Sequence, residues 1–170
     1  MYEGAVLIAL GSNLEGGFGS SETLLEAALD NFPAAGFKVV ARSPLWRSAS
    51  WPDPALPDYI NAVAVVETAM PPTETLRALH QLEASFGRRR DQRNAPRTLD
   101  LDLIAHGRSV IAGGGLKLPH PDAARRLFVM GPLAQIAPDW VHPVLGETAR
   151  ALAAKADIGR DARPIPASAL

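Results

Sequence analysis

The sequence predicts a single α+β domain in which helices pack against an antiparallel sheet. Segments with the apolar pattern of strands alternate along the chain with segments whose apolar residues recur at helical spacing. The 170 residues suit one domain that buries a sizeable core. We find no internal repeat, low-complexity segment or interdomain linker. We therefore expect one domain over residues 1–160, followed by a C-terminal tail over residues 161–170.

The first elements are expected to be a strand, a helix and a second strand. A continuous apolar run over residues 5–10 stops at Gly11, which predicts a buried strand and a turn. A helix should then begin near Ser20 or Ser21, because serine is a good N-cap residue. One face of this helix carries apolar residues at helical spacing, namely Leu24, Leu25, Ala28, Leu29 and Phe32. Residues 37–46 are rich in β-branched and aromatic residues and predict the second strand.

A proline-rich loop separates the second strand from the third. Residues 48–57 contain three prolines, which exclude regular structure, and a loop of this length suggests a functional role. Residues 59–68 alternate well and predict the third strand. One face of this strand should carry Tyr59, Asn61, Val63 and Val65, and the other Ile60, Ala62, Ala64 and Val66.

A second long helix should open at Pro71 and Pro72, since proline is tolerated in the first turn, and end near Gly87. Its buried stripe is predicted to be Leu76, Leu79, Leu82 and Phe86. A basic loop over residues 88–97 follows, and then a fourth strand that contains Asp100 and Asp102. The resulting order β-α-β-β-α-β indicates a ferredoxin-like core.

The remainder of the chain is expected to add smaller elements. Residues 109–112 predict a short strand, and the glycine triplet 113–115 a flexible connection. Helices are expected over residues 128–137 and 148–156. The end of the chain, residues 164–170, is expected to be frayed.

The fourth strand carries the most informative chemistry. Asp100 and Asp102 should point to one face, their Cα atoms roughly 6.5–7 Å apart, while the leucines between them enter the core. Two such carboxylates need a counter-charge, and Mg²⁺ normally bridges carboxylates to phosphates. Five arginines lie just upstream and suit phosphate oxygens: Arg88, Arg89, Arg90, Arg93 and Arg97. Alternatively, the two Asp could simply face solvent, although Thr98 and Ile104 share their face.

Two polar residues in restrained positions are further candidates. His120 lies between two prolines, so it could donate to a phosphate, or it could be a capping or core histidine. Asn61 lies among apolar residues, where its amide could pair internally or could bind the edge of a heterocycle. Aromatic residues that could stack on such a ring are Tyr59, Trp51 and Phe128, although most aromatic residues are core residues.

Composition and missing motifs exclude several classes of protein. The chain has no cysteine, so disulfides, thiolate zinc sites and cysteine nucleophiles are excluded. The net charge of −1 gives no indication of a nucleic-acid or membrane partner. The sequence contains neither a P-loop nor a nucleophile elbow. No signal peptide or membrane-spanning run is found, and we expect a cytoplasmic monomer.

Taken together, these segments resemble the 6-hydroxymethyl-7,8-dihydropterin pyrophosphokinases of folate biosynthesis. The most specific segment is Pro96-Arg97-Thr98-Leu99-Asp100-Leu101-Asp102. Further matching segments occur in the family's order, at residues 9–14, 57–62, 82–88, 118–121 and 126–133. The resemblance implies a ferredoxin-like fold and transfer of pyrophosphate from ATP to the pterin hydroxymethyl group, with release of AMP.

The resemblance also implies roles for particular residues. Catalytic roles fall on Asp100, Asp102, Arg97 and Arg88, with two Mg²⁺ ions between the two Asp and the ATP phosphates. ATP contacts fall on Glu83, Arg90, Leu103, His120, Arg126 and His80. Pterin contacts fall on Tyr59, Asn61, Phe128, Ser48 and Trp51. The chain departs from common family residues at Asn94, His80 and Gly115, which stand where tryptophan, glutamine and arginine are found.

Two other functions remain open at this point. Paired carboxylates on a ferredoxin-like sheet also suit a different two-metal nucleotidyl or phosphoryl transferase. A non-catalytic RNA-binding module can use the same fold, but it should show stacked aromatics and a basic surface. The net charge of −1 argues against the RNA-binding module.

Overall fold

The computed structural model describes residues 2, 4–13, 20–50, 53, 55, 57–87 and 99–166. Its main sheet has the order β5-β1-β4-β3-β8, and β2 also pairs with β4. The strands are β1 (Val6–Ser12), β2 (Lys38–Arg42), β3 (Trp46–Ser48), β4 (Tyr59–Glu67), β5 (Asp100–His106) and β8 (Arg163–Pro164). Each of these pairings is antiparallel.

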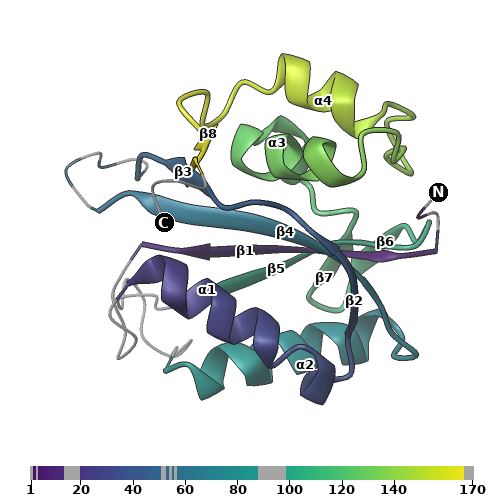
Figure 1. Cartoon of the computed structure of the whole chain (residues 1–170). Helices are drawn as coiled ribbons and strands as arrows, with labels where there is room; N and C mark the ends of the chain where they lie inside the picture. The colour runs from purple at the N-terminus through teal and green to yellow at the C-terminus, as the bar shows by residue number, and fades with distance from the viewer. Residues whose placement is uncertain are drawn as a thin grey trace.

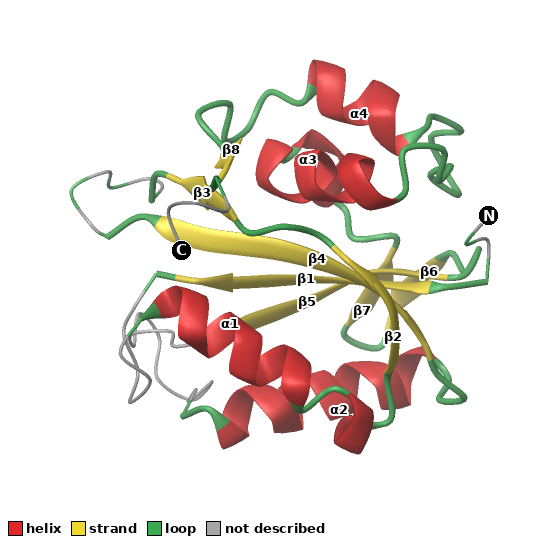
Figure 2. Ribbon diagram, viewed as in Figure 1, coloured by secondary structure: helices red, strands yellow, loops and turns green. Residues whose placement is uncertain are grey.

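Helices cover both faces of this sheet (Figures 1 and 2). The helices α1 (Ser21–Asp30) and α2 (Pro72–Ser85) lie on one face, and α3 (Leu127–Ile136) and α4 (Ala149–Lys155) on the other. Short 3₁₀ turns, η1 (Pro33–Ala35) and η2 (Ala123–Arg125), extend them. β4 pairs with β1 on one side and with both β2 and β3 on the other, and β5 pairs with the free side of β1. The expected ferredoxin-like antiparallel sheet is therefore confirmed.

The alternation predicted for residues 59–68 is confirmed by two separate hydrophobic cores. Ile60, Ala62, Ala64 and Val66 belong to the core beneath α1 and α2. Val63 and Val65 belong to the core beneath α3 and α4. Since successive side chains of a strand point to opposite faces, Asn61 and Tyr59 point to the α3 side. The central strand is therefore buried on both faces, and its polar residue belongs to the face where α3 lies.

The strand predicted over residues 37–46 is wrong in one respect, because it is divided into β2 and β3. At the division, Ser43 replaces the regular ladder: its backbone N–H donates to the Val63 carbonyl at 2.9 Å, and its Oγ accepts from the Val63 N–H at 2.9 Å. Pro44 follows and has no N–H to donate. The chain therefore bends, and Trp46 comes to lie opposite Asn61.

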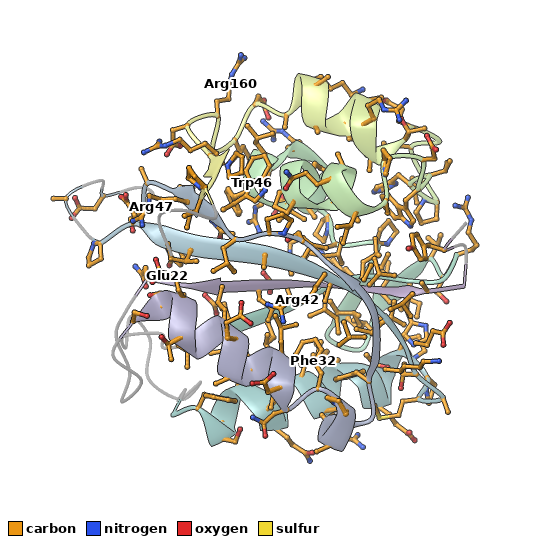
Figure 3. The ribbon with its side chains drawn as sticks, viewed as in Figure 1. Glu22, Phe32, Arg42, Trp46, Arg47 and Arg160 are labelled. Atoms are coloured by element: carbon orange, nitrogen blue, oxygen red, sulfur yellow. The ribbon has the colours of Figure 1, made fainter. Side chains whose placement is uncertain are left out.

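Helix α3 approaches β3 very closely at a glycine. A Cβ atom added to Gly131 would lie 2.5 Å from the indole of Trp46, so only glycine permits this contact. The Trp46 Nε1–H also donates to Gln135 Oε1 at 2.6 Å. Figure 3 shows Trp46 between β3 and α3. These contacts fix the second half of α3 relative to the start of β3.

The helix starts follow their sequence signals. Ser20, one of the two expected caps, accepts the Thr23 N–H at 3.1 Å through its Oγ. Thr148 caps α4 by accepting the Ala151 N–H at 3.1 Å. The observed bounds of α3 and α4 lie within about one residue of those predicted.

Two expectations about the second half of the chain need correction. Residues 113–115 are not a flexible connection: Gly114 and Gly115, with φ of +64° and +80°, form the tight turn between β6 (Ile111–Gly113) and β7 (Leu116–Leu118). Two consecutive positive φ angles suit the twist of a two-residue hairpin turn, and glycine adopts them without strain.

The start of the supposedly frayed end is ordered. Arg163 and Pro164 pair with Arg47 and Trp46, and the Ile165 N–H donates to the Leu45 carbonyl at 2.9 Å. The Ile165 side chain packs against the core beneath α1 and α2. Residues 167–170 lie outside the described residues. The division into a domain over 1–160 and a tail over 161–170 stays a prediction.

The loop between α3 and α4 contains a buried histidine that should make stability depend on pH. His142 is 6% exposed, and its Nδ1 accepts the N–H groups of Val144 and Leu145 at 3.2 and 3.0 Å. Burial lowers the pKa of His142, Arg108 lowers it further, and Glu147 opposes the shift. Protonation of Nδ1 would remove both hydrogen bonds.

We predict that the free energy of unfolding decreases as the pH falls from 7.5. The decrease begins at about 6.5, the pKa of His142 in the unfolded chain, and continues down to its lowered pKa in the folded chain. In this window the unfolded chain binds a proton that the folded chain does not, so acid favours unfolding. H142N keeps an oxygen acceptor without a titrating ring. Urea unfolding at pH 7.5 and 5.5 should give a smaller difference for H142N than for the wild type. An equal difference would exclude His142 as a source of the pH dependence.

Candidate functional site

The two aspartates lie on the α3 side of the sheet, where β5 forms its edge. Leu99, Leu101 and Leu103 are 0–4% exposed in the core beneath α1 and α2, so Asp100 and Asp102 take the opposite face, as predicted. Asp100 is half-buried and Asp102 is exposed. Gly11 lies opposite Asp100 in the register, and Ala9 opposite Asp102. Both neighbours are small and buried.

A groove of about 410 Å³ adjoins Asp102 at the edge of β5. Its walls come from α2, β5, the β6–β7 hairpin and the segment that follows the hairpin. The lining residues are Leu76, His80, Leu101, Asp102, Leu103, Gly113, Gly115, Leu116, Lys117, His120 and Pro121. The volume is within the range of small-molecule sites. The structure therefore brings Asp102 together with three residues predicted to bind ATP: His80, Leu103 and His120.

Glu83 holds α2 against β5. Its side chain is 1% exposed, and its Oε2 accepts the Leu101 N–H at 2.9 Å. The Leu101 N–H points away from β1. Because alternate residues of a strand point their N–H and C=O groups to the same side, those of Leu103 also point away from β1. Glu83, which we predicted to bind ATP, is thus placed beneath the groove, where it fixes the strand that forms one wall.

A β-bulge in β5 anchors His120. The register between β1 and β5 shifts at Leu7 and Ile8, and Ile104 is the additional residue. Its carbonyl accepts the His120 N–H at 2.8 Å. The His120 Nδ1 accepts the Asp122 N–H at 3.2 Å. In the neutral ring the proton is therefore on Nε2, which is a hydrogen-bond donor.

The charge state of His120 agrees with this arrangement. Burial lowers its pKa, and the positive charge of Arg126 lowers it as well, whereas Asp102 and Asp122 oppose the shift. The neutral form is consequently favoured near pH 7. Of the two interpretations left open for His120, the capping one describes its Nδ1, which bonds its own loop. The ring also lines the groove, and donation to a phosphate stays a prediction.

A second group of predicted residues meets on β3 and β4. Asn61 is 6% exposed, and its Nδ2 donates to Ser48 Oγ at 2.9 Å. A Cβ atom on Gly11 would lie 3.5 Å from Asn61 Oδ1, which places the amide oxygen over the glycine. The internal pairing considered for Asn61 thus applies to its amide nitrogen.

Further aromatic and basic residues predicted for the site lie on β4 and at the start of α3. Tyr59 is half-buried at the start of β4, and Phe128 is half-buried in the first turn of α3. The guanidinium carbon of Arg126 is 5.8 Å from the centre of the Phe128 ring. Arg126 also lies 3.9 Å from Asp122. Arg126 is therefore positioned between the segment that holds His120 and the aromatic ring.

Four of the predicted site residues lie outside the described residues: Arg88, Arg90, Arg97 and Trp51. Conversely, sequence reasoning missed Lys117, which lines the groove from β7, and Asp122, which orients His120. Lys117 is a single charge in a short strand and has no sequence signal. Asp122 could have been recognised, because it follows the Pro-His-Pro segment within turn distance.

The donor atoms of the site suit a hard cation. Carboxylate oxygens such as those of Asp100 and Asp102 are preferred ligands of Mg²⁺. Within the described ranges, no group of three or more His, Cys, Asp and Glu residues could hold a metal by itself. These two carboxylates would therefore supply part of a ligand set, to be completed by other oxygen atoms. In the same ranges, no helix is long and apolar enough to cross a membrane.

Strand-borne carboxylates beside a small-molecule groove define a class of enzyme that transfers phosphate-containing groups. Comparison with known proteins gives the family. The family described as 7,8-dihydro-6-hydroxymethylpterin-pyrophosphokinase (HPPK) matches residues 7–138. The chain belongs to this family, whose name agrees with the resemblance found in the sequence.

Curated relatives carry the same name. A 2-amino-4-hydroxy-6-hydroxymethyldihydropteridine pyrophosphokinase from Methylorubrum extorquens is 36% identical, over 88% of this chain and 92% of its own. The protein of that name from Pseudomonas aeruginosa is 40% identical, over 81% and 83%. A third, from Synechocystis, is 44% identical over 67% of this chain but only 58% of its own length.

Solved structures agree on the fold. The HPPK-DHPS of Plasmodium falciparum, wild type with SDX-DHP, has a TM-score of 0.70 at 13% identity. The likeness covers 89% of this chain and 44% of that longer chain. A second Plasmodium falciparum structure, the S436F/A437G/A613S triple mutant with SDX-DHP, has a TM-score of 0.69 and covers the same shares.

We predict that the hydrogen bond from Leu101 to Glu83 contributes measurably to stability. E83A leaves a buried backbone N–H without its acceptor and should lower the free energy of unfolding by about 2 kcal/mol. E83Q keeps an oxygen acceptor at that position and should lose clearly less. Urea unfolding followed by circular dichroism provides the measurement. If E83Q is as unstable as E83A, the bond to Leu101 is not what Glu83 contributes.

Proposed function

We propose that this chain transfers pyrophosphate from ATP to the hydroxymethyl group of 6-hydroxymethyl-7,8-dihydropterin, with Mg²⁺, in folate biosynthesis. The products would be AMP and the pterin diphosphate. Family membership supports the reaction, and one geometric observation supports the assignment of residues. That observation is the row formed by Asp100, Gly11 and Asn61 on three neighbouring strands.

In this row Gly11 is the Cα partner of both Asp100 and Asn61. Two strand spacings separate the outer residues, roughly 10 Å. Because glycine has no side chain, no side chain of β1 separates the carboxylate from the amide. A flat heterocycle held at Asn61 could extend across Gly11 and direct a substituent toward Asp100. This is the placement that transfer between a pterin and a nucleotide requires.

Each side of the row then has its own ligand. We assign the pterin to the Asn61 side, where Ser48 binds the amide and Tyr59 shares its face of β4, with Phe128 contributed by the start of α3. The Asn61 Nδ2 is engaged by Ser48, so its Oδ1 is the atom best suited to accept an N–H of the heterocycle. Ser48 would therefore determine that the Asn61 Oδ1, and not the Nδ2, faces the ligand.

We assign ATP to the groove at the edge of β5. The backbone N–H and C=O of Leu103, which point away from β1, suit hydrogen bonds with the polar edge of a base. The Nε2–H of His120 suits a phosphate oxygen, and Arg126 and Lys117 add positive charge near the groove. His80 lines the same wall. Arg88, Arg90 and Arg97 would complete the charge neutralisation, and Trp51 the pterin pocket, from outside the described residues.

Asp100 and Asp102 would hold Mg²⁺, and two ions would fit the pair together with phosphate oxygens. Bound Mg²⁺ neutralises negative charge on the transferring phosphates. The protein residues position both substrates in line and exclude water, which is most of what phosphoryl-type transfer needs. Monomeric state, cytoplasmic location and the lack of a nucleic-acid partner stay predictions from the sequence.

The aspartate assignment predicts loss of activity without loss of fold. D100N and D102N should each lower turnover by at least about 100-fold, because charge stabilisation at the transferring group is lost. D139N is the control, since Asp139 follows the end of α3 and its side chain is 83% exposed. The assay measures AMP formed from ATP and Mg²⁺ with and without the pterin. Near-wild-type turnover of either variant would overturn the assignment, and ADP or free pyrophosphate would indicate a different transferase.

The division of the site into two halves predicts a selective effect at Asn61. N61A should raise the KM for the pterin by about tenfold, which corresponds to the loss of one good hydrogen bond. The KM for ATP should change less than twofold. Initial rates with each substrate varied in turn give both values. Equal changes in the two constants would contradict the role of Asn61 in pterin binding.

A further inference from the structure

The segment of residues 157–165 follows α4 and connects two parts of the proposed pterin pocket. It lies beyond the residues 7–138 that the family comparison matches. It leaves the start of α3, turns at Arg160, which points outward in Figure 3, and returns to the edge of β3. We refer to it as the C-terminal segment.

At one end, the C-terminal segment closes the start of α3. The helix has no side-chain cap at Arg126. Instead, the Leu127 N–H donates to the Ile158 carbonyl at 2.9 Å, and the Ile158 N–H donates to the Arg125 carbonyl at 2.9 Å. The segment thus satisfies a backbone donor that the helix start leaves without an intrahelical partner. Phe128 is the next residue of the helix.

Gly159 lies directly against the Phe128 ring. A Cβ atom at this position would be 2.5 Å from Phe128 Cδ1 and 2.9 Å from Cε1. The φ angle of Gly159 is +70°, in the region that glycine adopts without strain. Glycine is therefore required twice, by the backbone angle and by the contact with the ring. The position of the ring depends on this glycine.

At the other end, the C-terminal segment holds the start of the proline-rich loop. Asp161 Oδ2 accepts the Ala49 N–H at 2.6 Å. Ala49 directly follows Ser48, the residue that binds the Asn61 amide. Pairing of Arg163 and Pro164 with β3, and the bond from Ile165 to Leu45, fix the preceding residues. Because β3 has only three residues, these contacts add to its pairing with β4 in holding Ser48 in place.

We propose that the C-terminal segment positions the pterin pocket, with Gly159 setting the place of the Phe128 ring and Asp161 fixing the backbone at Ala49 beside Ser48. Each acts through a neighbouring residue, Gly159 through Phe128 and Asp161 through Ala49, so both are positioning residues. The inference rests on the proposed function for the identity of the ligand. Its structural part, that Asp161 fixes Ala49, does not depend on the reaction.

The first experiment measures kinetics in full-length variants. G159A should raise the KM for the pterin by about tenfold, because displacement of a positioning group weakens productive binding. G146A is its matched control, since Gly146 has a φ of +69° but nothing within 4 Å of an added Cβ. G146A carries the same backbone strain and should leave the KM unchanged. In neither variant should the KM for ATP change by more than twofold.

Asp161 is tested in the same way. D161A should raise the KM for the pterin, and D161N should restore much of it, because its amide oxygen can still accept the Ala49 N–H. D139A controls for loss of an exposed carboxylate. If G159A and D161A match their controls while the wild type forms AMP with the pterin, the positioning role is wrong. If the wild type forms no pterin-dependent AMP, the proposed function is wrong.

A second measurement tests the segment independently of activity. Hydrogen exchange of the Ala49 amide, followed by NMR, should be faster in D161A than in the wild type and largely restored in D161N. Exchange at the Leu127 amide should stay unchanged, because its acceptor is a backbone carbonyl. Unchanged exchange at Ala49 in D161A would overturn the assignment whether or not the enzyme is active.

Discussion

The register of β1 against β4 and β5 is the constraint on which the site depends. Gly11 is paired with Asn61 on one side and with Asp100 on the other. Side chains of a strand alternate between faces, so a slip by one residue would turn Asp100 and Asp102 into the core beneath α1 and α2. The same slip on β4 would bury Asn61 among the leucines. The hydrophobic cores on both sides of the sheet therefore keep the polar residues in one row.

Different contacts hold the strands at the two ends of this row. At β5, the buried Glu83 carboxylate and the bulge at Ile104 engage backbone groups that an edge strand would otherwise expose. At β3, the Trp46 contact with Gly131 and the pairing with β8 serve the same purpose. In both places the groups that close the sheet edge also place a candidate ligand-binding residue. His120 depends on the first edge, and Ser48 on the second.

Small residues allow several close approaches around the site. α3 covers Val63 and Val65, and Ala9 belongs to the same core. Gly11 lies between Asn61 and Asp100 in the register of the sheet. Gly131 lets α3 approach β3, and Gly159 lets the C-terminal segment approach Phe128. Close packing limits the displacement of these elements, and in-line transfer tolerates little displacement.

The sequence alone determined most of the long elements, the faces of the strands and the family. Alternation placed Asp100, Asp102, Asn61 and Tyr59 on their faces, because the period of a strand is a local property. The Pro-Arg-Thr-Leu-Asp-Leu-Asp segment carried the chemistry, because carboxylates within a buried strand are rarely placed without a function.

Only the tertiary structure decided which segments meet. The interruption at Ser43 and Pro44 and the ordered residues 163–165 each depend on a partner distant in sequence. The burial of Glu83, the Ser48–Asn61 bond and the contact of Asp161 with Ala49 are likewise long-range. No local pattern encodes such contacts, because their free energy arises from pairing and burial between elements. The sequence thus specifies which residues are available for the site, and packing between distant elements specifies where they act.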